Sequence, residues 1–186
     1  VREKARQYVK TKKPLFIIGS PPCDPFSIMQ NLNAGKCDPV AQQQKIIAGR
    51  IHLAFCVELY QMQLNEGRYY LHEHPLTASS WREKCMEKFS SQPQNFTTKI
   101  HMCAYGMKIP DKFGNQFVYK PTQFLTNSPL LAAQLERKCD KSHLHARLGG
   151  NRTKQAAIYP PQLIDASCKG INEQIKAHKM DQNIEA

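Results

Sequence analysis

A cysteine in a proline-rich loop is the residue of this sequence best suited to act as a nucleophile. Cys23 lies in the string Gly-Ser-Pro-Pro-Cys-Asp-Pro-Phe-Ser, which follows an apolar run at residues 15–18. The two prolines restrict the backbone ahead of the thiol, and a cysteine is intrinsically a strong nucleophile once it is deprotonated. The string therefore predicts a reactive cysteine; the alternative is a buried structural cysteine in a turn.

A glutamate between two histidines is the second candidate. Glu73 lies in the string Leu-His-Glu-His-Pro at residues 71–75. In open α/β sheets, functional groups gather at the carboxyl ends of the strands. If the two strands are neighbours, Glu73 reaches the sheet edge that carries Cys23. Burial there would favour the protonated carboxyl, which can act as a general acid; the alternative is an ionised carboxylate in a loop.

The elements that position these residues follow from apolar runs and from proline and glycine signals. We expect helices at residues 2–12, 38–65, 79–89, 129–138 and 160–177, and strands at 15–18, 68–75, 96–104 and 117–119. The alternation of strands and helices indicates an α/β fold with a largely parallel sheet. We expect a basic N-terminal helix over residues 1–13 and a single α/β domain over 14–186.

The charge of the chain is strongly positive. It holds 26 Lys and Arg against 15 Asp and Glu, a net charge of +11. Such an excess predicts affinity for a polyanion, and the alternative is a solvated basic surface. No apolar run approaches the roughly 18 residues that a membrane-spanning helix needs, so we expect no membrane partner.

The seven cysteines are an odd number and include no Cys-x-x-Cys pair. A full disulfide framework would leave one of them over, and a chain of this length does not need such a framework. We therefore expect an intracellular, reducing compartment, either the nucleus or the cytoplasm.

Four patches of the sequence, in the same order, resemble motifs of the DNA (cytosine-5) methyltransferases. The Pro-Pro-Cys-x-x-Phe-Ser string around Cys23 resembles their motif IV, and the strand that ends in Glu73 resembles motif VI, with His74 where the family has asparagine. Residues 105–122 and 155–163 resemble the two later motifs. The resemblance implies a Rossmann-like methyltransferase sheet, largely parallel and here incomplete.

The resemblance also implies a covalent mechanism on a flipped-out cytosine. The Cys23 thiolate attacks carbon 6, Glu73 protonates ring nitrogen 3, and carbon 5 takes the methyl group of S-adenosylmethionine. The implied cofactor contacts are Pro21, Pro22 and Ile158. The implied nucleic-acid contacts are Ser27, Lys120, Arg147, Arg152 and Lys154.

The glycine-rich cofactor motif of that family does not precede Cys23 in this sequence. A second chain or a missing N-terminal segment would have to supply it. The leading prediction is S-adenosylmethionine-dependent methylation of cytosine carbon 5 in DNA. The alternative is a non-catalytic nucleic-acid-binding domain derived from a methyltransferase fold.

Histidines support a third hypothesis, a metal-dependent enzyme. His72 and His74 flank the glutamate, and Cys139, His143 and His145 bring ligand types close together. A zinc site needs about four such ligands in a tetrahedron, and the sequence shows no obvious fourth. We therefore assign no metal site, and polar loop histidines or nucleic-acid contacts are the ordinary interpretation.

Overall fold

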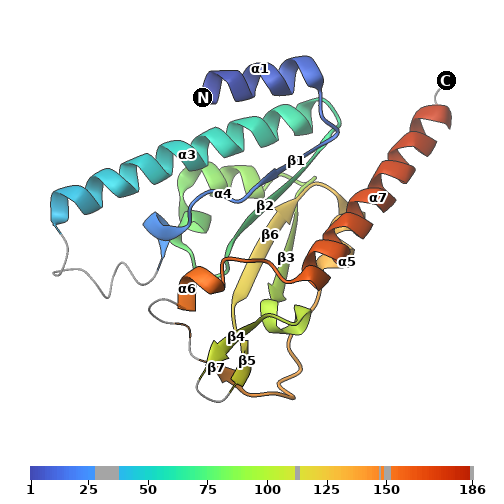
Figure 1. The fold of residues 1–186 in the computed structure, drawn as a ribbon. Coiled ribbons are helices and arrows are strands. Elements are labelled where there is room, and N and C mark those ends of the chain that lie inside the picture. Colours follow the sequence, from blue (N-terminus) through green and yellow to red (C-terminus); the bar gives the residue numbers. More distant parts are fainter. Residues whose placement is uncertain (28–37, 112–113, 147, 149–151, 185–186) are drawn as a thin grey trace. The chain divides into compact units, whose positions relative to one another are not determined.

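The structure, a computed structural model, describes residues 1–27, 38–111, 114–146, 148 and 152–184 (Figure 1). The chain divides into two compact units. The first holds residues 1–97 and 125–128, and the second holds residues 98–124 and 129–186.

The first unit is built on two parallel strands joined by a long helix. Its elements are α1 (Arg2–Lys12), β1 (Phe16–Gly19), the 3-10 turn η1 (Asp24–Phe26), α3 (Pro39–Asn65), β2 (Tyr69–Pro75), the 3-10 turn η2 (Ser79–Arg82) and α4 (Lys84–Ser90). β1 and β2 pair with Phe16 opposite Tyr69 and Gly19 opposite His72. A parallel pair needs a long crossover connection, which α3 supplies.

Local signals explain where α3 begins and ends. The Asp38 side chain accepts a hydrogen bond of 2.9 Å from the backbone N–H of Val40, and proline occupies the first helical position. Both features are typical of a helix start. Beyond the last turn, Gly67 adopts a φ of 65°, a conformation that favours glycine. The predicted helix over residues 38–65 is therefore confirmed, and so is the predicted helix over 2–12.

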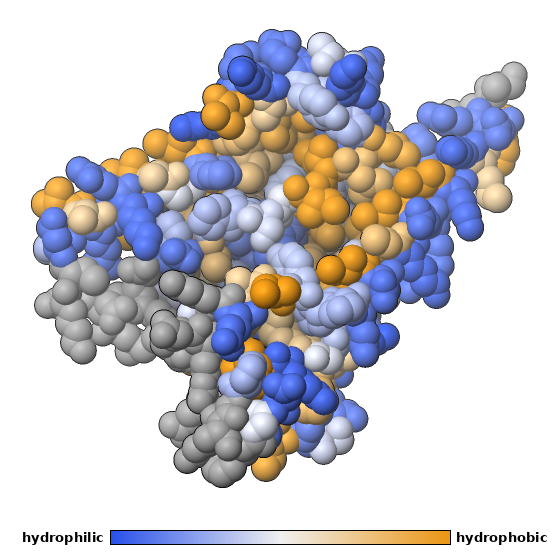
Figure 2. Space-filling model, in the orientation of Figure 1, coloured by the Kyte–Doolittle hydropathy of each residue, from blue (hydrophilic) through white to orange (hydrophobic). Residues whose placement is uncertain are grey.

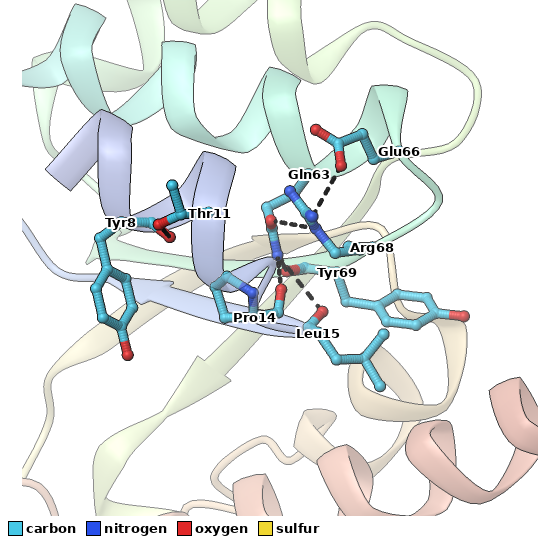
Figure 3. A network of polar contacts seen from close by, with 8 residues as sticks. All are labelled: Tyr8, Thr11, Pro14, Leu15, Gln63, Glu66, Arg68 and Tyr69. Atoms are coloured by element: carbon cyan, nitrogen blue, oxygen red, sulfur yellow. Dashed lines mark hydrogen bonds and ion pairs between the residues drawn. The ribbon is translucent and has the colours of Figure 1, made fainter.

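A buried polar network holds the end of α3 against the starts of β1 and β2 (Figure 3). The Gln63 side-chain amide donates 2.9 Å hydrogen bonds to the backbone carbonyls of Pro14 and Tyr69. Arg68 Nε donates to Gln63 Oε1 at 2.8 Å, and its guanidinium also pairs with Glu66 at 2.8 Å. Both Gln63 and Arg68 are buried, so these bonds replace the water that the side chains lose on folding.

Aromatic and aliphatic side chains form the core of the first unit. Tyr60 of α3 stacks on Tyr70 of β2 with ring centroids 4.7 Å apart. The buried members are Phe26, Leu53, Cys56, Tyr60, Tyr70, Ala78, Met86, Phe89 and Leu125. Phe26 therefore anchors the loop that carries Cys23 in this core.

The second unit combines a small sheet with packed helices. Its elements are η3 (Met102–Tyr105), β4 (Lys108–Asp111), β5 (Gly114–Val118), α5 (Pro129–Leu135), β7 (His145–Ala146), α6 (Arg152–Gln155) and α7 (Pro161–Ile184). β5 pairs antiparallel with β4 and parallel with β7. α5 packs closely on α7, because Gly170 lets the Leu131 backbone approach.

The predicted Rossmann-like, largely parallel sheet is wrong. The strands form two small mixed sheets, mostly antiparallel, with the orders β1-β2-β6-β3 and β4-β5-β7. β3 (Phe96–His101) and β6 (Pro121–Thr126) each contribute residues to both units. Only two residues separate β4 from β5. A connection this short cannot hold the crossover that a parallel pair requires, and β4 and β5 pair antiparallel.

Other predicted elements have different bounds. The helix expected over residues 79–89 is interrupted at Glu83, whose φ of −69° and ψ of 134° are extended. The strand expected over 96–104 ends at His101, and the helix expected over 129–138 ends at Leu135. The first half of α3 is also more exposed than its apolar composition predicts, since Ile47 and Ile51 are each 45% exposed.

None of the described helices is both long and apolar enough to cross a membrane. Figure 2 shows the hydrophilic surface that α1 presents.

Candidate active site at the ends of β1 and β2

A serine and a glutamate meet where β1 and β2 end. Ser20 follows β1 directly, and its hydroxyl donates a hydrogen bond of 2.7 Å to Oε2 of Glu73 in β2. Glu73 is only 6% exposed. The expectation that the two strands are neighbours is therefore confirmed, and Glu73 lies at the edge from which the Cys23 loop departs.

His74 fixes the start of that loop. Its Nε2 lies 2.9 Å from the Pro21 carbonyl oxygen, and its Nδ1 lies 2.6 Å from the Ser80 hydroxyl. A carbonyl only accepts, so Nε2–H donates and Nδ1 accepts from Ser80. Burial lowers the pKa of His74, against opposing effects of the Pro21 carbonyl and Glu73. A neutral imidazole thus holds the first proline of the loop.

Cys23 itself begins a tight turn. Its carbonyl accepts a 3.0 Å hydrogen bond from the backbone N–H of Phe26, and the residue is half-buried and forms no disulfide. Phe26 lies in the core with its ring 6.0 Å from that of His74. The Ser79 hydroxyl donates to the Phe26 carbonyl at 3.4 Å. The turn is therefore held on both sides of the cysteine.

Two hollows border the loop. One, of about 300 Å³, is lined by Ile17, Ile18, Gly19, Ser20, Pro21, Pro22, His52, Cys56, Leu59 and Tyr60. The other, of about 160 Å³, has Ser27 in its wall, beside Arg50 and Glu83. These two charged side chains form an ion pair of 3.0 Å. The described linings of the two hollows include residues on either side of Cys23 but neither Cys23 nor Glu73.

Tyr60 and His72 form an uncharged, buried pair close to the ends of β1 and β2. The Tyr60 hydroxyl and His72 Nδ1 share a hydrogen bond of 2.9 Å. Burial holds the pKa of Tyr60 well above its ordinary value and, aided by His74, holds the pKa of His72 well below. Both groups therefore stay uncharged across the physiological range.

Two of the remaining predicted contacts, Lys120 and Ile158, belong to the second unit. Lys120 is engaged within the second unit: its Nζ donates to the Ala156 carbonyl at 3.0 Å and lies 6.0 Å from the ring centroid of Tyr159. Ile158 also belongs to the second unit and is 76% exposed. Pro21 and Pro22 line the larger hollow of the first unit.

Three predicted basic contacts have no described side chain. Arg147 lies outside the described residues. Arg152 and Lys154 lie in α6, where only the backbone is described. Their assignment to nucleic acid stays a prediction.

A second group of reactive side chains lies in the second unit. One ligand atom from each of Cys103, Cys139, His143 and His145 lies within 4.8 Å of the others. The sequence analysis named three of them and missed Cys103, which lies far from the rest along the chain. Its only sequence signal is that it lies in the strand predicted over residues 96–104.

The chain matches no protein-family model, no curated protein and no solved structure in the comparisons made. The resemblance to cytosine methyltransferases therefore rests on the motif residues alone.

Proposed function

We propose that Cys23 and Glu73 act together on a pyrimidine base, with cytosine in DNA as the substrate. The observation that carries the proposal is the Ser20–Glu73 hydrogen bond at the parallel edge of β1 and β2. It holds a buried carboxyl beside the loop that carries Cys23, whose thiol forms no disulfide. A nucleophile and an acid at one edge are what addition to an aromatic ring requires.

The chemistry that these two groups can perform is a reversible addition. The Cys23 thiolate forms a bond to carbon 6, and the protonated Glu73 carboxyl gives its proton to ring nitrogen 3. The electron pair displaced from the ring makes carbon 5 nucleophilic, and carbon 5 takes a proton from water. Cytosine is restored when carbon 5 loses its original hydrogen, ring nitrogen 3 returns its proton to Glu73 and the thiolate departs. The net result is exchange of the carbon-5 hydrogen with solvent.

The described residues do not provide a recognisable S-adenosylmethionine site. Nucleotide-type cofactors are held by a glycine-rich turn and by a carboxylate on the ribose. The hollow lined by Pro21 and Pro22 contains no carboxylate among its described residues. The proposed step therefore ends at activation of carbon 5. Methyl transfer from S-adenosylmethionine, supplied through a second chain or a further segment, stays a prediction.

The charge of the chain supports a nucleic-acid substrate. The net charge of +11 attracts phosphate without regard to base sequence. The same charge favours the second candidate function, a nucleic-acid-binding domain without catalysis. The six described cysteines are free thiols, and a nucleophilic thiol needs reducing surroundings, so we infer an intracellular location in the nucleus or cytoplasm.

The test is release of tritium from DNA labelled at cytosine carbon 5, measured with the whole chain and no added cofactor. We expect release by the wild type, none by Cys23→Ser, and unchanged release by Cys168→Ser, which removes an exposed thiol. Glu73→Gln should reduce the rate about a hundredfold, the usual scale of acid–base catalysis. Binding of DNA without release by the wild type would favour the non-catalytic domain.

A further inference from the structure

Two cysteines and two histidines of the second unit converge on one point. His145 Nε2 lies 3.3 Å from Cys103 Sγ and 3.5 Å from Cys139 Sγ. His143 Nε2 lies 3.6 Å from Cys139 Sγ. Both imidazoles therefore direct the same nitrogen toward the two sulfurs. Neither cysteine forms a disulfide.

These separations match the edges of a zinc tetrahedron. With Zn–S bonds of about 2.3 Å and Zn–N bonds of about 2.0–2.1 Å, tetrahedral geometry places sulfur and nitrogen about 3.5 Å apart. The three distances between Cys103, Cys139 and the imidazoles, 3.3 to 3.6 Å, lie around this value. A set of two sulfurs and two nitrogens is also a donor set that favours zinc over magnesium or calcium.

The four residues come from three segments of the second unit, since Cys139 and His143 share residues 136–144. Cys103 lies in η3, and Cys139 lies beyond the end of α5. His145 lies in β7, where it pairs with Phe117 of β5. The ring of His143 stacks on that of Phe117 with centroids 3.9 Å apart. The chain thus brings the four ligands together through backbone pairing and ring stacking.

Groups around the ligands are suited to a bound cation. The backbone N–H of Lys141 donates to Cys139 Sγ at 3.3 Å, which stabilises a thiolate. The backbone N–H of Cys139 donates to His101 Nδ1 at 3.0 Å. With Nδ1 accepting, His101 Nε2–H donates to the Tyr119 hydroxyl at 3.3 Å. Such outer contacts orient the ligands of metal sites.

We propose that Cys103, Cys139, His143 and His145 bind one zinc ion with a structural role. Four protein ligands complete the tetrahedron and leave no position for substrate or water. Two thiolates and Zn²⁺ together carry no net charge, which suits the half-buried position. The ion joins residues 136–144, which contain no helix or strand, to η3 and β7. An open hollow of about 340 Å³, lined in part by His101, Tyr119 and Lys141, gives the ion access.

The proposal is independent of the proposed function. The four ligands belong to the second unit, and Cys23 and Glu73 belong to the first. Loss of either site in an experiment therefore does not imply loss of the other.

The first test is the metal content of the whole chain, purified without added chelator and measured by mass spectrometry. We expect one zinc per chain, retained by Cys168→Ser and Cys85→Ser. Cys103→Ser and His145→Asn should lower zinc affinity at least about a hundredfold, because loss of a ligand exceeds the 10- to 100-fold effect of outer contacts.

The second test does not depend on whether the variants fold. Co²⁺ added to metal-free wild-type chain should give the visible absorption of tetrahedral cobalt and the near-ultraviolet band of sulfur ligation. Zinc should abolish both at one equivalent. A wild-type chain that binds neither metal would overturn the proposal. So would a Cys103–Cys139 disulfide in freshly purified protein, because it would make the sulfurs unable to bind.

Discussion

The Ser20 hydroxyl donates a hydrogen bond of 2.7 Å to Glu73 across 53 residues of sequence. In Ser20→Ala the Glu73 carboxyl loses this partner and with it a fixed position in β2. We expect slower tritium release while the melting temperature changes little. Ser91→Ala, beyond the end of α4, is the control, and unchanged release by Ser20→Ala would contradict the assigned contact.

Gly19 has room for no side chain. A β-carbon there would collide with the Tyr60 hydroxyl and lie 2.9 Å from Cζ of the same ring. Gly19→Ala should lower the free energy of unfolding by about 1–3 kcal/mol, the usual cost of overpacking. Because Tyr60→Phe removes the colliding atom, the double variant should lose less than the sum of the single losses. Urea denaturation gives the free energy of unfolding of all three variants. If the losses of the two single variants simply added up in the double variant, residues 19 and 60 would not be in contact.

The buried histidines predict a loss of stability in acid. Burial lowers the pKa values of His72 and His74, so the fold keeps both neutral while the unfolded chain takes up protons near pH 6.5. Their contribution is complete above about pH 6.5 and is lost as the pH falls below it. Urea denaturation between pH 5 and 8 should show this slope. His74→Gln should reduce the slope, and an equal slope in the wild type and in His74→Gln would contradict a buried, neutral His74.

The basic N-terminal helix is part of the fold as well as a source of charge. Arg6 pairs with Glu58 of α3, with Nη2 2.9 Å from Oε2, and Val9 is buried. Lys4, Lys10 and Lys12 are exposed. Replacing these three lysines with glutamine should flatten the dependence of log K on log salt for DNA by about 2 to 3 units and leave the melting temperature nearly unchanged.

Arg6→Gln is the matched comparison for the three lysines. It removes one charge too, but it also breaks the contact with Glu58. We expect a lower melting temperature and a smaller change in salt dependence. If Arg6→Gln changed DNA binding as much as replacement of a single lysine and left the melting temperature unchanged, α1 would be only a basic surface.

The contact between α5 and α7 depends on Gly170. A β-carbon at Gly170 would lie 2.8 Å from the Leu131 Cα, which belongs to the backbone and cannot rotate away. Gly170→Ala should therefore separate the helices and destabilise the second unit by about 1–3 kcal/mol. Lys169→Ala changes the neighbouring exposed position and serves as the control in thermal unfolding. Equal melting temperatures for the two variants would contradict the close approach.

Local signals predicted α1, β1, α3 and β2. Asp38 and proline mark the start of α3, and the apolar run before Gly19 marks β1, because capping and burial depend on nearby residues. The parallel pairing of β1 with β2 was also predicted, but the order of the other strands was not. Strand–helix alternation alone does not reveal the two-residue connection that makes β4 and β5 antiparallel.

The candidate sites also combine contacts that the sequence could predict with contacts that it could not. The proximity of Ser20 and Glu73 follows from two strands that a helix joins, so the sequence could predict the shared edge. Cys103 joins His145 across 42 residues through η3 and β7, and no local pattern encodes that contact. Lys120 likewise has the charge of a phosphate contact, yet its ammonium group binds a carbonyl of its own chain.

The sequence separation of 53 between Ser20 and Glu73 also sets the order in which the candidate active site is made. Protein synthesis at 5–20 residues per second covers that separation in about 3 to 10 s, and closing so long a loop costs roughly 3.5 kcal/mol more than closing the shortest. The strand that precedes the nucleophile is therefore synthesised seconds before the strand that carries the acid. Until β2 is made, β1 has no parallel neighbour, so the candidate active site forms only after α3 and β2 have been added.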